Sequence, residues 1–142
     1  MNVLNVAKWF FSNMIKIGFE DIKYSLEHPT NYIIINTLSI TEQSCLIQNT
    51  ISIYNEEIII NNLIDNYETK KIKIIIYGIN STDETVERKY KQLISLGFTN
   101  VYVYLGGLFE WVILQDIYGV DEFPTTQKVV DILKWKPSRI IF

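Results

Sequence analysis

The sequence predicts an α/β fold of three layers, in which helices cover both faces of a central parallel sheet of about five strands. Short runs of apolar, mostly β-branched residues lack polar–apolar alternation, which is typical of strands buried on both faces. Segments with helical periodicity separate these runs, and alternating strands and helices imply parallel pairing through right-handed crossovers. The 142 residues suit one domain with one proper core.

The first part of the chain is predicted to form a helix, a strand and a second helix. Apolar residues at helix-compatible spacing predict an N-terminal helix over residues 1–14, and a brief strand is expected over residues 15–19. Ile22 and Leu26 lie four positions apart, which indicates an amphipathic helix. Pro29 disfavours helical backbone in the residue before it, so this helix should end immediately before the proline.

The middle of the chain alternates between apolar runs and one amphipathic helix. The runs at 32–35, 51–54 and 72–77 predict strands, and the last of these is the strongest candidate for a central strand. A helix is expected over residues 56–67, because its apolar residues recur on one face.

The helix predicted over residues 81–96 has signals at both ends. Ser81, with Glu84 three residues later, matches a capping box, and Gly97 stands where a C-terminal capping glycine belongs. A further strand is expected over residues 101–105, with helices over 108–118 and 126–135.

The whole chain is predicted to be one domain over residues 1–142. Its core spans residues 15–120, and residues 121–142 form a C-terminal extension.

Composition and charge exclude several classes of protein. The net charge is −3, with no basic stripe of the kind a nucleic-acid binder needs. The single cysteine and single histidine exclude an internal disulfide and a Cys/His zinc site. No apolar run approaches the ~18 to 20 residues needed to span a bilayer. A lone thiol suits a reducing compartment, so we expect a cytoplasmic protein.

The loop after the central strand is the candidate site, because ligands of open α/β sheets bind beyond the carboxyl ends of the strands. A glycine, a polar loop and a helix N-terminus together resemble a cradle for an anion. The acidic residues at the start of the helix already satisfy its dipole, which favours a well-capped helix without a ligand. The loop consists of Gly78, Ile79, Asn80, Ser81, Thr82, Asp83 and Glu84.

This region resembles a rhodanese domain, in which a buried strand ends in Tyr-Cys before the active-site loop. In the family, a helix ending in Gly-Phe follows, then a strand Asn-Val-Tyr and a Gly-Gly pair with a tryptophan four residues later. The resemblance spans about residues 15–120, and its motifs are quite specific in the later half. The matching residues are Ile74, Ile75, Ile76, Tyr77, Gly78, Leu96, Gly97, Phe98, Asn100, Val101, Tyr102, Leu105, Gly106, Gly107 and Trp111.

Departures from the family pattern predict that the chain does not transfer sulfur. Rhodanese chemistry needs a cysteine thiolate that carries a persulfide, and Gly78 occupies that position. Asn36 and Leu38 match the aspartate and arginine of the family's upstream motif. Cys45 precedes the expected third strand, away from the cradle, so we do not expect it to substitute. The resemblance therefore implies a fold without catalytic residues, metal or cofactor.

The segment from Gly106 onwards is more similar to cysteine-less rhodanese-like proteins of protists and of the large DNA viruses that infect them. Isoleucine, asparagine and lysine are used heavily, which is the amino-acid bias expected from an AT-rich genome and fits such an origin. This resemblance implies a location in the host cytoplasm or the virion. Several aromatic residues could form a binding face, although core packing is the expectation favoured here: Phe109, Trp111, Tyr118, Phe123 and Trp135.

Three functions stay open on the sequence. The first is a non-catalytic module that binds an unidentified protein partner or acts as a scaffold. The second is a hydrolase that binds Mg²⁺ through Asp83 and Glu84, with Asp116 and Asp121 approaching in space. The third is an oligomeric structural or virion-associated protein. Its motivating feature is the N-terminal segment, where the consecutive aromatic residues Trp9, Phe10 and Phe11 cannot all face one core.

Overall fold

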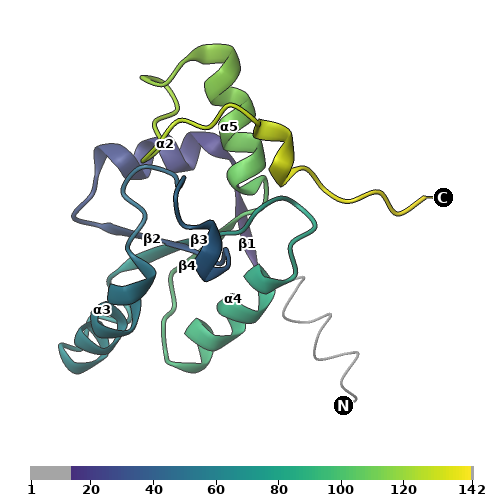
Figure 1. Ribbon diagram of the computed structural model, residues 1–142. Helices are drawn as coiled ribbons and strands as arrows, with labels where there is room; N and C mark the ends of the chain where they lie inside the picture. Colours follow the sequence, from purple (N-terminus) through teal and green to yellow (C-terminus); the bar gives the residue numbers. More distant parts are fainter. Residues whose placement is uncertain (1–13, 142) are drawn as a thin grey trace.

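The computed structural model describes residues 14–141, and these residues form a parallel sheet with helices on both faces (Figure 1). The sheet order is β1-β4-β3-β2, and all three strand pairs are parallel. The predicted α/β class is confirmed, but the described residues form four strands rather than about five. The strands are β1 (Ile15–Ile17), β2 (Tyr32–Asn36), β3 (Lys73–Tyr77) and β4 (Val101–Tyr104).

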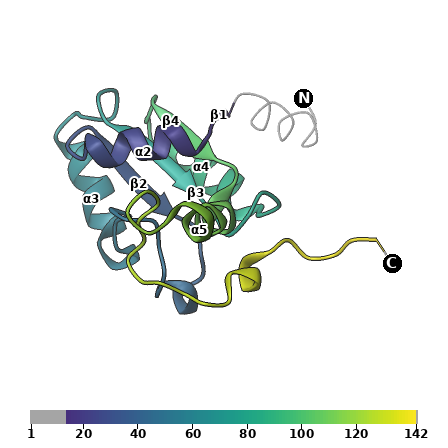
Figure 2. The same ribbon diagram turned by 90° about the horizontal axis from the view of Figure 1, so that it is seen from above.

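Two separate cores lie on the two faces of the sheet, as the three-layer prediction requires. Side chains of β3 alternate between them: Ile75 belongs to the core on the α2 and α5 side, and Ile76 to the core on the α3 and α4 side. Figure 2 shows these helices distributed around the sheet. The helices are α2 (Phe19–Glu27), α3 (Ile53–Asp65), α4 (Thr85–Ser95) and α5 (Gly107–Tyr118), with short 3-10 helices at Ile40–Glu42 and Ile132–Trp135.

The strand predicted over residues 51–54 is wrong, because helix α3 already begins at Ile53. The Ser52 side chain accepts a hydrogen bond from the amide of Tyr54 and caps the helix start. The strand-like pairing nearest to this run is an isolated bridge from Thr50, the residue before it, to Ile34 of β2. The predicted strand over 15–19 is also shorter, since β1 ends at Ile17 before α2 begins.

The helix predicted over residues 126–135 is wrong apart from the last turn at Ile132–Trp135. The preceding backbone is held by a distant part of the chain instead. The amide of Thr126 donates to the carbonyl of Leu46, and Thr125 forms an antiparallel bridge with Ile47. These hydrogen bonds satisfy the backbone groups that a helix would otherwise pair locally.

Helix α4 begins at Thr85 rather than at residue 81, so the proposed Ser81–Glu84 capping box is not formed. The carboxylate of Asp83 accepts from the amide of Thr85 in its place. The predicted end is confirmed: Gly97 has φ +100°, a conformation that favours glycine, and the amide of Phe98 donates to the carbonyl of Leu93.

Two further predictions concern the N-terminal segment and the membrane. The predicted N-terminal helix and its aromatic residues lie outside the described residues, except for Met14, which is buried in the core on the α3 and α4 side. No helix within residues 14–141 combines the length and the apolar character needed to cross a bilayer.

Candidate functional site

The loop between β3 and α4 lies at the carboxyl edge of the sheet, where the sequence predicts the site. Gly78 is buried directly after β3, Ile79, Asn80 and Asp83 are partly buried, and the rim residues are exposed. The exposed rim residues of the loop are Ser81, Thr82 and Glu84.

The carboxylate of Asp83 accepts hydrogen bonds from donors at both ends of this loop, on Ile79 and on Thr85. Its Oδ2 accepts from the amide of Ile79 at 2.9 Å, and its Oδ1 accepts from the amide and the hydroxyl of Thr85 at 3.0 and 2.6 Å. Charge-assisted hydrogen bonds of this kind are stronger than neutral ones. The loop therefore holds an anion from its own chain. Of the two acidic residues expected to satisfy the helix start, Asp83 does so, whereas the side chain of Glu84 makes no capping hydrogen bond.

The same carboxylate leaves no room for a side chain on residue 78. A Cβ atom added to Gly78 would collide with Oδ2 of Asp83 and lie 2.8 Å from Cγ2 of Val86. Any larger residue here would have to displace the carboxylate of Asp83 and the methyl of Val86, so glycine is the residue that this arrangement accepts without a shift.

The N-terminus of α5 closes the other side of the loop. The amides of Leu108 and Phe109 donate to the carbonyls of Gly78 and Ile79, at 2.9 and 2.8 Å. Gly107 permits this approach, since its φ is +67° and an added Cβ would lie 2.7 Å from the carbonyl oxygen of Gly78. These two helix amides are paired within the protein rather than turned towards a ligand.

The loop is tied to the C-terminal segment through Asn80. Its amide nitrogen donates to the carbonyl of Trp135 at 2.9 Å, and its oxygen accepts from the amide and hydroxyl of Thr82. Trp135 is 2% exposed, and its indole nitrogen has no hydrogen-bond partner among the described residues. The C-terminal turn, anchored by the buried Trp135, therefore restrains the outer part of the loop.

The end of β2 supports the loop with neutral groups. Asn36 exchanges hydrogen bonds with Gln43 and accepts from the amide of Leu38. The hydroxyl oxygens of Thr85 and Thr37 lie 2.8 Å apart, within hydrogen-bond distance, which joins the end of β2 to the first residue of α4. Leu38 is 6% exposed and belongs to the core, so this edge presents no charged side chain from the upstream motif.

Cys45 is a core residue. It is 1% exposed, and its thiol hydrogen-bonds to the carbonyl of Gln127 at 3.1 Å in the C-terminal segment. Burial raises the pKa of this thiol, which keeps it protonated at neutral pH. A protonated thiol is a poor nucleophile.

The predicted magnesium ligands are not brought together. No group of three or more histidine, cysteine or acidic side chains within residues 14–141 could hold a metal ion. Asp116 lies near the C-terminal end of α5, whereas the loop contacts its first turn at Gly107, and nine residues of helix span about 14 Å. Both oxygens of Asp83 already accept hydrogen bonds from the loop and the start of α4.

Sequence reasoning missed one partly buried polar pair at the same edge of the sheet. The hydroxyl of Tyr104, at the end of β4, donates to Oε1 of Glu110 at 2.7 Å. Burial raises the pKa of Tyr104, and the adjacent carboxylate of Glu110 raises it further. No spacing motif signals this pair; the position of Tyr104 at a strand end is the only sequence clue.

The aromatic residues of the later segment mostly pack inside the molecule, as the sequence analysis favours. Trp111 and Phe123 stack edge-to-face with ring centroids 5.0 Å apart, and Trp135 is buried with them in the same core. Tyr118 is 63% exposed and lies at the surface. These residues therefore do not form one exposed binding face.

Comparison with known proteins identifies the fold. No protein-family model matches the chain, and no curated protein matches it. The Alr3790 protein from Anabaena sp. superimposes with a TM-score of 0.55 at 20% identity, covering 83% of this chain and 97% of the other. A solution structure of the rhodanese-like domain from the same Anabaena protein gives 0.52 at 22% identity, covering 82% and 87%.

A thiosulfate sulfurtransferase from Pseudomonas aeruginosa has the same fold within a larger chain. It superimposes with a TM-score of 0.56 at 14% identity, over 72% of this chain and 19% of the other. The α/β fold is thus rhodanese-like, in agreement with the resemblance found in the sequence.

Proposed function

We propose that this chain is a catalytically inactive rhodanese-like domain that acts as a binding or scaffold module. The observation that carries the proposal is the contact between Gly78 and Asp83. A sulfur carrier at the end of β3 would need a thiolate on residue 78, and the space for that side chain holds the carboxylate of Asp83.

The filled loop supports binding elsewhere on the domain rather than turnover in the cradle. Asp83 places a negative charge among the backbone amides that would otherwise bind an anionic sulfur donor such as thiosulfate. A second anion would be repelled there. Cys45 offers no replacement, because its thiol is buried and its pKa is raised.

Thiosulfate:cyanide sulfurtransferase activity of the purified full chain tests the proposal. We expect thiocyanate formation at the level of the enzyme-free control. Turnover that is abolished by Cys45→Ser would show a catalytic thiol and end the proposal.

A gain-of-function pair sharpens the test. Gly78→Cys alone should stay inactive, because the new side chain meets the carboxylate of Asp83 and the methyl of Val86. Gly78→Cys combined with Asp83→Ala removes the contact with the carboxylate, leaves only the Val86 methyl to shift, and frees the amide of Ile79. This variant should therefore take the outer sulfur of thiosulfate, release sulfite and form a persulfide detectable by mass spectrometry. Persulfide on the single variant would contradict the steric argument.

We also propose that the chain groups with the cysteine-less rhodanese-like proteins of protists and their giant viruses, and that it works in the host cytoplasm or the virion. The AT-rich composition and the residues from Gly106 onwards support this placement.

A further inference from the structure

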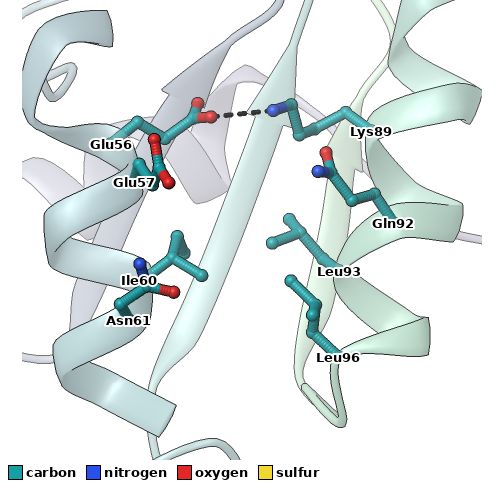
Figure 3. A pocket seen from close by; sticks show the side chains of 8 residues that line it. All are labelled: Glu56, Glu57, Ile60, Asn61, Lys89, Gln92, Leu93 and Leu96. Carbon is teal, nitrogen blue, oxygen red and sulfur yellow. Dashed lines mark hydrogen bonds and ion pairs between the residues drawn. The ribbon is translucent and has the colours of Figure 1, made fainter. Parts of the chain in front are cut away.

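A groove runs between α3 and α4 on one face of the sheet, and we name it the α3–α4 groove (Figure 3). It consists of two hollows of about 370 and 410 Å³ that share Glu56, Lys89 and Gln92. The ion pair between Lys89 Nζ and Glu56 Oε2, at 2.7 Å, spans the groove where the hollows meet.

The hollow towards the end of α4 has an apolar wall. Ile60 of α3 faces Leu93 and Leu96 across the gap in Figure 3. Ile60 and Leu93 are buried, but Leu96 is 43% exposed, which leaves apolar surface accessible at this end. An apolar side chain of a partner would bury that surface.

The hollow towards the carboxyl edge of the sheet carries an uncompensated positive charge. Glu56 and Lys89 neutralise each other, whereas Arg88 is exposed and has no hydrogen-bond or ion-pair partner within residues 14–141. The side-chain amide of Gln92, one turn further along α4, likewise has no hydrogen-bond partner within residues 14–141. Arginine binds carboxylates with paired, planar donors.

We propose that the α3–α4 groove binds an extended segment of a partner protein, with an acidic side chain on Arg88 and an apolar side chain on the exposed Leu96. This inference rests on the proposed binding function and names the surface and the partner chemistry. Glu56 and Glu57 on the opposite wall oppose a polyanion such as nucleic acid, which favours a peptide with an isolated acidic residue.

The helix fixes the spacing of the two anchors. Eight residues of α-helix separate Arg88 from Leu96, which is about 12 Å at 1.5 Å per residue. An extended chain covers about 3.3 Å per residue, so the acidic and apolar side chains of the partner should lie roughly three or four residues apart.

Selection of random heptapeptides displayed on phage against the immobilised full chain tests this inference. We expect enriched peptides to pair an acidic residue with a large apolar residue at that spacing. Synthetic peptides with the enriched sequences should bind the Arg88→Gln variant about tenfold more weakly than the wild-type chain, as measured by fluorescence anisotropy, because a charge-assisted contact is lost. Leu96→Ala should also weaken binding, and both positions are exposed enough for the variants to fold.

Lys128→Gln is the matched control, since it removes one exposed positive charge beside Val129, which packs on the opposite face of the sheet. Binding unchanged in Lys128→Gln and weakened in Arg88→Gln supports the groove. No enriched peptide, or equal binding to Arg88→Gln and wild type, overturns it. Sulfurtransferase turnover, measured on the same preparation, would instead overturn the proposed function and is read independently of peptide binding.

Discussion

The carboxyl group of Asp83 lies against the backbone of Gly78, in the volume that any side chain on residue 78 would need. It is held there by the amide of Ile79 and by the amide and hydroxyl of Thr85. Gly78 and Asp83 therefore depend on each other. A side chain on residue 78 would displace the carboxylate of Asp83, and a shorter side chain on residue 83 would leave space beside residue 78.

Gly78→Ala should destabilise the protein by about 1–3 kcal/mol, because the added methyl group overpacks a buried site. Urea unfolding followed by circular dichroism would measure the free energy of unfolding. Gly18→Ala is the control, since an added Cβ there meets nothing within 4 Å and φ is −100°. Equal stability of Gly78→Ala and wild type would contradict the contact.

Asp83→Ala should lower the free energy of unfolding by about 1–3 kcal/mol, because the partly buried amides of Ile79 and Thr85 lose their acceptor. Glu84→Ala, at the exposed neighbouring position, should change stability by no more than about 0.5 kcal/mol. A larger effect at Glu84 than at Asp83 would show that the helix start is capped differently.

Cys45 should react slowly with a thiol reagent such as DTNB in the native protein. Its thiol is buried, and burial raises its pKa, so at pH 7 to 8 both access and the thiolate fraction are low. Absorbance at the released thionitrobenzoate band should develop in seconds only after denaturant is added. Rapid labelling of the native chain would place the thiol at the surface.

Stability should fall at alkaline pH because of Tyr77 and Tyr104. Burial raises the pKa of both phenols above the ordinary value of 10, so folding favours their protonated forms. Their contribution is fully present below pH 10 and is lost as the pH rises above 10. Tyr104→Phe should flatten the decline in the free energy of unfolding between pH 9 and 11, and an unchanged slope would contradict the assignment.

The sequence predicts the strands and helices whose residue pattern is itself informative, such as a continuous apolar run or a capping glycine. The run at 72–77 is β-branched without alternation, and the structure places it as β3 with both faces buried. Gly97 ends α4 as its pattern indicates. The α/β class follows from such local signals in their order along the chain, and the rhodanese-like fold was expected from the resemblance of the later motifs to that family.

The remaining errors come from contacts between residues far apart in the sequence. Residues 126–131 belong to a predicted helix, but the amide of Thr126 donates to the carbonyl of Leu46, eighty positions away. The short run at 51–54 looks like a strand until Ser52 is seen to cap α3. In the loop, the acidic character of Asp83 is visible in the sequence, whereas its contact with Gly78 depends on the folded backbone.

Residues 121–135 form a wall of the core rather than an appendage to it. Trp111 donates to the carbonyl of Pro124 and Gln115 to that of Phe123, and Trp135 is buried in the same core as Cys45 and Leu108. Domain limits borrowed from the rhodanese pattern, which ends near residue 120, would cut through this wall. A fragment designed on those limits would expose the α5 side of the sheet to water and lose the tether on Asn80.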